Sequence, residues 1–271
     1  MNPLNLTPNE ISDAADLLFQ AERTGVQCGL LSLAHPQMTL DDAYAVQSAL
    51  IARKVSAGRY GIGWKIGLTS RAMQQALNIT TPDSGVLLDD MLFAHGSTVP
   101  KGRFIQPRVE AEIAFVMKTA LAGPNVSRDD VVAATDFVAP SLEILDTRIL
   151  RADPATGATR IITDTVSDNA ANAGVMLGSA RHAIGAFDLR WVGAIVKRDG
   201  VVEETGLGAG VLDDPVLGIV WLVQRLARYG MGLKAGHIVL SGSFIRPVEA
   251  LPASQFHADF GPFGQVDLAF A

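Results

Sequence analysis

Apolar residues recur at helical spacing in two segments near the start of the chain. In the first, Thr7 and Glu10 form a capping-box pattern ahead of apolar positions three and four residues apart. In the second, Thr39 opens the same kind of signal and Gly58 follows the last apolar position. The pattern therefore predicts a helical region over residues 1–60.

Beyond residue 60 the chain changes to short β-like runs separated by glycines. Strands are predicted at 112–117, 140–148, 189–200, 201–206, 237–248 and 264–271, and helices at 129–137 and 216–230. There is no regular alternation of strands and helices and no dinucleotide fingerprint, so a doubly wound sheet is not expected. The order predicts an α+β fold, in which a mixed, largely antiparallel β domain over residues 61–271 forms one structural unit with the helices.

Composition and net charge indicate which kinds of molecule the protein can bind. Of the 271 residues, 48% are hydrophobic and 18% charged, which is typical of a globular protein with a large core. The net charge is −6 and basic residues are not clustered, which argues against nucleic acid as a partner. No signal peptide or membrane span is expected. With Cys28 as the one cysteine, no intrachain disulfide is possible, and a cytoplasmic protein is the default expectation.

Three acidic residues interrupt apolar β segments. In "PRVEAEIAF", strand alternation puts Glu110 and Glu112 on the same face, about 7 Å apart along the strand. Glu143 interrupts the apolar run in "PSLEILDTR" in the same way. Buried, unpaired carboxylates are costly, and oxygen ligands of this kind suit Mg²⁺ or Mn²⁺. A 2-oxo acid could then displace water from the ion. The alternative is a strand face covered by solvent.

Four other polar residues leave two interpretations open. Lys65, in a glycine-rich run, is a candidate for proton transfer or for stabilising an enolate, or it is a surface lysine with a buried stem. Asp83 in "TPDSG" is typical of a turn. Arg148 can pair with a carboxylate of the protein or of a substrate. The small polar residues of 163–174, Ser167 among them, form a substrate loop or a hydrogen-bonded turn.

Several motifs in order resemble the hydratase/decarboxylase branch of the fumarylacetoacetate hydrolase superfamily. They are "GWKIGLTSRAMQ", "QPRVEAEIAFV", "LEILDTR" and "DTVSDNAANAG", and the resemblance runs from about residue 40 to the C-terminus. It implies a mixed β-roll or distorted β-barrel with a helical N-terminal region. It also implies a homo-oligomeric enzyme that uses Mg²⁺ or Mn²⁺ on a small unsaturated 2-oxo acid.

The resemblance also implies roles for single residues. The metal ligands of the family are similar in position to Glu110, Glu112 and Glu143. The lysine and aspartate of the family's acid–base steps correspond to Lys65 and Asp83, although the chain has Ser84 where an aromatic residue is common in the family.

Two features favour a hydratase whose substrate carries two carboxylates, in the bacterial breakdown of aromatic compounds through homoprotocatechuate. The segment 151–178 is longer than its counterpart in hydratases of monoacids, and Arg246 in "GSFIRPV" is placed to meet a second carboxylate. The predicted substrate-binding residues are Arg148, Ser167 and Arg246. A monoacid hydratase and a decarboxylase remain close alternatives. A Schiff-base aldolase built on Lys65 and a non-enzymatic binding protein are more remote.

Overall fold

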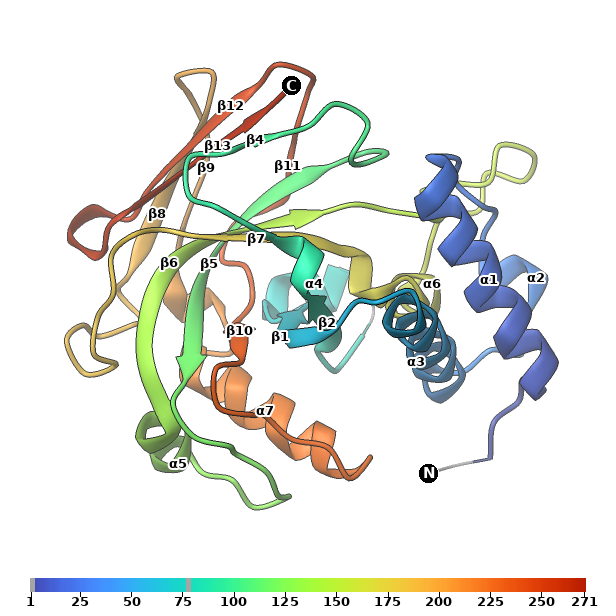
Figure 1. The fold of residues 1–271 in the computed structure, drawn as a ribbon, viewed down its shortest axis with the longest axis horizontal. Coiled ribbons are helices and arrows are strands. Elements are labelled where there is room, and N and C mark those ends of the chain that lie inside the picture. Colours follow the sequence, from blue (N-terminus) through green and yellow to red (C-terminus); the bar gives the residue numbers. More distant parts are fainter. Residues whose placement is uncertain (1–2, 77–78) are drawn as a thin grey trace.

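The computed structural model describes residues 3–76 and 79–271. Three helices form the N-terminal region: α1 (Pro8–Thr24), α2 (Leu31–Ala34) and α3 (Leu40–Ser56). They lie together on one side of the β-rich remainder of the chain (Figure 1). Both predicted helix starts are confirmed, because α1 has a capping box between Thr7 and Glu10 and α3 has one between Thr39 and Asp42.

Two sheets form the β-rich part, and the larger one carries the site. Its strand order is β2-β1-β10-β5-β6-β7-β3, with β11 beside β5. These strands are β1 (Gly61–Gly67), β2 (Asp83–Leu88), β3 (Leu92–Phe93), β5 (Arg108–Met117), β6 (Thr135–Leu145), β7 (Asn172–Leu177), β10 (Ile238–Leu240) and β11 (Val248–Glu249). The pairs β1–β10 and β3–β7 are parallel, and the other pairs of this sheet are antiparallel.

The second sheet packs against the first and closes the core. Its order is β4-β13-β12-β8-β9. The strands are β4 (Thr98–Val99), β8 (Gly193–Arg198), β9 (Val201–Leu207), β12 (Gln255–Asp259) and β13 (Gln265–Phe270). One apolar cluster joins the inner faces of both sheets and includes Phe115 on β5 and Phe256 on β12. The long strands β5 and β6 curve around this core (Figure 1), so the predicted α+β class with a distorted β-roll is confirmed.

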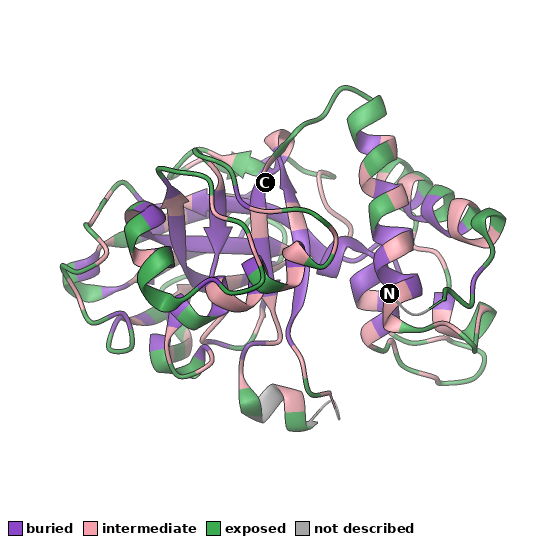
Figure 2. Ribbon diagram, turned by 90° about the horizontal axis from the view of Figure 1, so that it is seen from below, coloured by how far each residue is buried: buried purple, intermediate pink, exposed green. Residues whose placement is uncertain are grey.

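Four further helices in the described residues complete the fold. They are α4 (Arg71–Ala76), α5 (Arg128–Ala134), α6 (Ile162–Ser167) and α7 (Pro215–Ala227). Of these, α7 contacts the larger sheet at β1 and α6 contacts it at β2. The N-terminal helices have an apolar core of their own, centred on Leu18 and Leu50, and Ile149 from the segment after β6 joins it. Figure 2 shows the buried residues concentrated in the sheets and on the inner faces of these helices. The division of the chain at residue 60 stays a prediction.

Several predicted elements differ from the observed ones in their bounds, and two of them show the physical reason clearly. The helix predicted at 129–137 ends at Ala134, because Thr135 already begins β6. The strand predicted at 237–248 is broken after Leu240, where Gly242 takes a φ of 117° that favours glycine, and pairing resumes only at β11. Within residues 3–76 and 79–271, no helix combines the length and apolarity that crossing a bilayer requires.

Candidate functional site

Three carboxylates converge where β5 and β6 pair. The antiparallel register sets Glu110 directly opposite Glu143, and strand alternation puts Glu112 on the same face of β5 as Glu110. One oxygen from each carboxylate lies within 4.8 Å of the others. Glu112 is 1% exposed and Glu143 is fully buried, whereas Glu110 is half-buried. The structure therefore brings together the three acids that the sequence singled out, with one of them reachable from outside.

The oxygens of this carboxylate cluster are poorly satisfied by the protein. The backbone N–H of Gly242 donates to Glu112 Oε2 at 2.7 Å. Glu112 Oε1 and both oxygens of Glu143 accept no well-aligned hydrogen bond within the described part of the chain, although the ammonium of Lys65 forms an ion pair with Glu143 Oε1. Burial and the negative charge of Glu143 raise the pKa of Glu110 to about 8, and they raise the pKa of Glu112 as well. Unsatisfied buried oxygens in this arrangement fit a hard divalent cation.

Lys65 lies beside the carboxylate cluster on β1. Its Nζ is 3.4 Å from Glu143 Oε1, and the residue is 3% exposed. Burial alone would lower the pKa of Lys65, but the carboxylates of Glu143 and Asp83 outweigh burial and hold it above its ordinary value. The interpretation of Lys65 as a surface lysine is therefore wrong, and its ammonium faces the acids.

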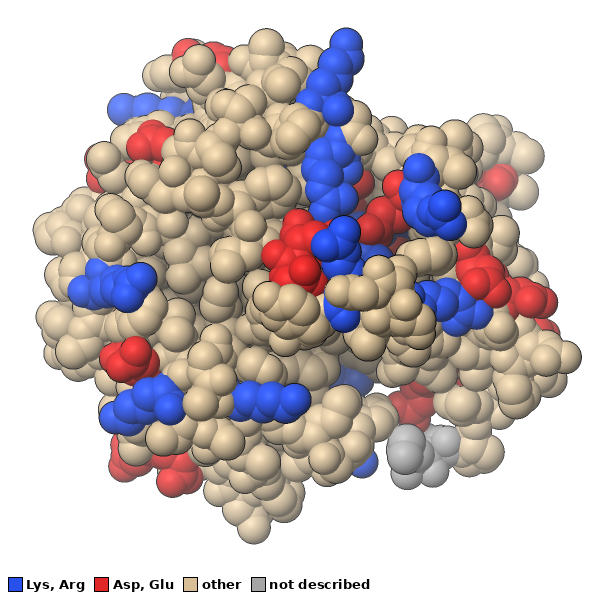
Figure 3. Space-filling model, in the orientation of Figure 1, with Lys and Arg blue, Asp and Glu red and all other residues tan. Residues whose placement is uncertain are grey.

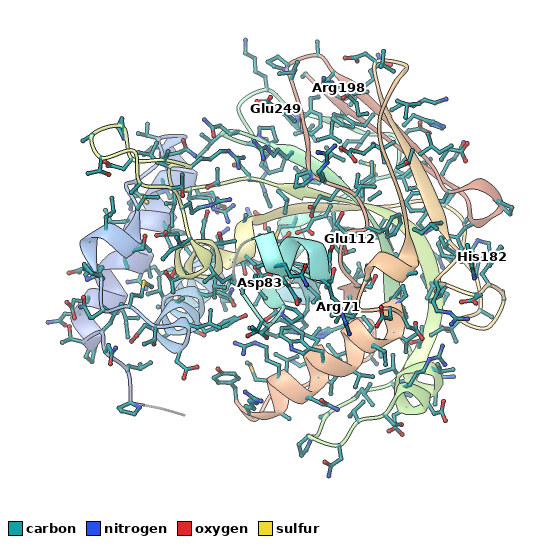
Figure 4. The ribbon with its side chains drawn as sticks, turned by 180° about the vertical axis from the view of Figure 1, so that it is seen from behind. Arg71, Asp83, Glu112, His182, Arg198 and Glu249 are labelled. Atoms are coloured by element: carbon teal, nitrogen blue, oxygen red, sulfur yellow. The ribbon has the colours of Figure 1, made fainter. Side chains whose placement is uncertain are left out.

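Asp83 is the first residue of β2 and is 2% exposed, so its interpretation as a turn residue is wrong. It pairs across the strands with Gly67. A Cβ at position 67 would lie 2.3 Å from Asp83 Oδ1 and 3.0 Å from Lys65 Nζ, so both side chains crowd against this glycine. Burial raises the pKa of Asp83, and Lys65 offsets part of that effect. Figure 4 shows Asp83 and Glu112 in the middle of the molecule, on β2 and β5.

Helix α3 fixes the strand that carries Asp83, through two residues that the sequence analysis missed. The backbone N–H of Ser84 donates to the hydroxyl of Tyr44 at 3.2 Å. Gln47 Nε2 donates to the carbonyl oxygens of Ser84 and Val166, each at 2.9 Å. The available signal was a polar side chain at position 47, within the apolar periodicity of α3. The N-terminal helices thereby position the site.

Arg148 pairs with a carboxylate of the protein, one of the two partners predicted for it, and its contact with a substrate stays a prediction. Its guanidinium forms a buried ion pair with Asp168 and donates to the backbone oxygens of Asp168 and Asn172. It is 2% exposed, so these internal partners occupy it. Asp168 begins a turn in which residues 169–171 all have positive φ, between 52° and 58°. Arg148 therefore holds a strained turn next to the site.

The other two predicted substrate-binding residues are in different surroundings. Ser167 lies at the end of α6, is fully buried, and its hydroxyl has no partner among residues 3–76 and 79–271. Arg246 comes four residues after Gly242, but its side chain is 78% exposed and pairs with Glu204 at 2.6 Å. Both roles stay predictions, and the pairing with Glu204 already neutralises Arg246.

The chain is similar to known proteins over nearly its whole length, although no family model matches it. It is 49% identical over 256 residues to 2-oxo-hept-4-ene-1,7-dioate hydratase of Escherichia coli, covering 94% of this chain and 96% of that protein. It is 38% identical over 265 residues to 2-keto-4-pentenoate hydratase 3 of Pseudomonas putida, with 98% and 96% covered. The solved structure of 4-oxalocrotonate decarboxylase from Pseudomonas putida G7, complexed with magnesium and adipate, matches with a TM-score of 0.93. That match has 30% identity and covers 99% of this chain and all of that one.

Proposed function

This chain belongs to the hydratase/decarboxylase branch of the fumarylacetoacetate hydrolase superfamily, and we propose that it is a metal-dependent hydro-lyase. The proposed reaction adds water to 2-oxo-hept-4-ene-1,7-dioate and gives 4-hydroxy-2-oxoheptanedioate, in the breakdown of aromatic compounds. The observation that carries the proposal is the convergence of Glu110, Glu112 and Glu143 beside Lys65 and Asp83. Family membership also leads us to expect a homo-oligomer in the cytoplasm.

Glu110, Glu112 and Glu143 are the proposed ligands of Mg²⁺ or Mn²⁺. The unsatisfied buried oxygens of Glu112 and Glu143 support this assignment, and the similar decarboxylase is described with magnesium. A cation bound there supplies Lewis-acid stabilisation of negative charge on the 2-oxo oxygen of the substrate. The half-buried Glu110 marks the side from which a substrate can approach.

Lys65 and Asp83 are the proposed acid–base groups. A proton leaves C3 and a proton is added at C5, which brings the double bond into conjugation with the ketone. Water then adds its oxygen at C4, and C3 regains a proton. Neighbouring groups with perturbed pKa values suit these transfers. A Schiff-base aldolase would need a neutral Lys65, which the surrounding carboxylates oppose.

The close structural likeness to a decarboxylase favours one alternative activity, in which the same site releases carbon dioxide. An activity panel separates the two. Purified protein is given C5 to C7 unsaturated 2-oxo acids with Mg²⁺ or with a chelator. We expect the C7 dioate to lose its dienoate absorbance fastest, with Mg²⁺ only and without carbon dioxide. Stoichiometric carbon dioxide would favour the decarboxylase, and full turnover in the chelator would contradict a metal enzyme.

The affinity for Mg²⁺ is expected to fall as the pH falls from 8 to 6. Because the pKa of Glu110 lies near 8 and that of Glu112 is also raised, the folded protein retains protons on the carboxylate cluster in this range. Mg²⁺ must displace them, so affinity drops by up to about tenfold per pH unit for each proton released. Titration calorimetry in two buffers of different ionisation enthalpy measures the release directly. A pH-independent affinity with no proton release would contradict the proposed ligands.

A further inference from the structure

Three arginines lie together next to the carboxylate cluster. Arg108 is the first residue of β5, two residues before Glu110, so the two side chains share a face about 7 Å apart. Arg151 and Arg160 come from the long segment between β6 and α6. The backbone N–H of Arg160 donates to the carbonyl of Arg151 at 2.9 Å, so the segment folds back and makes them neighbours.

None of these three guanidinium groups has an acidic partner in the described parts of the chain. No carboxylate oxygen lies within 4.0 Å of any of them. Arg151 donates only to Gln106, through two bonds of 3.3 Å, and Arg160 donates to the hydroxyl of Thr147. All three arginines are half-buried. They therefore retain donors that can bind an anion.

The nearby acids form no ion pair with this arginine cluster in the described parts of the chain. Both oxygens of Asp146 accept backbone N–H groups, from Ile105 at 2.9 Å and Gln106 at 2.7 Å. Glu249 is exposed, and its backbone oxygen accepts from Arg198 at the rim, where Figure 4 places both residues. Asp146 and Glu249 act electrostatically on Arg151, and Asp168 and Asp164 act on Arg160, but none of these acids forms an ion pair with the three guanidinium groups.

The positive charges of the three arginines repel one another, and they also act on acidic residues of the site. Burial and the charges of Arg108 and Arg160 lower the pKa of Arg151 to about 10. Arg108 also acts electrostatically on Glu110, and Arg160 on Asp83. On the face of the molecule drawn in Figure 3, basic side chains run down to a group of acidic ones near the centre. A bound carboxylate would relieve the repulsion through charge-assisted hydrogen bonds.

We propose that Arg108, Arg151 and Arg160 bind the second carboxylate of a dicarboxylic 2-oxo acid whose first carboxylate would lie at the cation held by Glu110, Glu112 and Glu143. This deepens the proposed function and rests on it, because it names the substrate class of the same site. In this proposal, the three arginines, which have free N–H donors, take the place of Arg246 as the residues that recognise the second carboxylate. The substrate would then span from the carboxylate cluster to the arginine cluster, and acids with one carboxylate would lose one of the two attachments.

The test uses two unreactive ligands that differ only in the second carboxylate. Saturated 2-oxoheptanedioate and 2-oxoheptanoate are titrated calorimetrically, with Mg²⁺, into wild-type protein, Arg108→Gln and Arg151→Gln. We expect the dioate to bind the wild type at least about tenfold more tightly, and each variant to lose about tenfold for the dioate only. Arg151→Lys should retain part of the preference. Arg190→Gln, a surface arginine paired with Asp188, is the matched control and should retain all of it.

Three results would overturn the proposal: no preference for the dioate in the wild type, an equal loss for both ligands in the variants, or a preference that only Arg246→Ala removes. Thermal melting first confirms that each variant is folded, and Arg151 has few contacts to lose. Because no turnover is needed, the binding result can be read even if the activity panel shows no hydration. If the protein hydrates the C7 dioate but shows no binding preference for the dioate over the monoacid, only the proposed arginine subsite is contradicted.

Discussion

Glu112→Gln is expected to abolish hydration while leaving the fold at least as stable as before. Removing one of three proposed metal ligands should lower kcat/KM by more than about 100-fold, since even groups behind the ligands cost 10- to 100-fold. The stability follows from the surroundings of the side chain. One oxygen of Glu112 has no donor in the described structure, and the charges of Glu143 and Glu110 oppose its ionisation. A neutral amide removes that repulsion, and its oxygen can still accept from Gly242.

Two measurements check this result together. Initial rates on the C7 dioate report activity, and thermal melting with and without Mg²⁺ reports metal binding, which should raise the Tm of the wild type but not of the variant. Glu203→Gln makes the same chemical change in a surface pair with Arg198 and should alter neither quantity. A Glu112→Gln protein that keeps its Mg²⁺-dependent shift in Tm would contradict the assignment.

The carboxylate cluster could be predicted from the sequence because its signals are local. Strand alternation alone puts Glu110 and Glu112 on one face, and Glu143 stands out within an apolar run. Their actual meeting depends on the register of β5 against β6, which pairs residues 33 positions apart around α5 and sets Glu143 opposite Glu110. Nothing local fixes that register, since slipping it by one residue would turn the face away.

The errors and the alternatives that the sequence left open share a cause, which is that distant partners decided the outcome. Arg148 has the same local sequence whether it meets a substrate or Asp168, and only the turn after α6 brings Asp168 to it. The strand predicted through Gly242 is broken there, where the backbone N–H of that glycine turns to Glu112 on another strand. The sequence around Tyr44 indicates only a helix, and the role of its hydroxyl becomes visible only through the contact with Ser84 at β2. Sequence periodicity reports burial of a face, but not which neighbour covers it.

Lys65→Met is expected to lower kcat by about 100- to 10,000-fold, because it removes a group that transfers protons to or from the substrate. Binding of Mg²⁺ is expected to tighten at a pH high enough to leave the carboxylates of the cluster unprotonated, which matters because Lys65 lowers their pKa values. The ammonium of Lys65 lies 3.4 Å from Glu143 and offsets the same negative charge that would hold the cation. A loss of turnover together with tighter Mg²⁺ binding would not arise from unfolding of the site. Calorimetric titration with Mg²⁺ and rates on the C7 dioate measure the two effects.

A second buried lysine supplies the control for that variant. Lys54 is 5% exposed and pairs with Glu22 on α1, in the N-terminal helices. Lys54→Met removes the same kind of charge from a buried pair, so it should lower the free energy of unfolding yet leave kcat nearly unchanged. If both variants lost turnover in proportion to their lost stability, Lys65 would be a structural residue. If Lys65→Met kept its turnover, the proton transfers would have to be assigned to other groups.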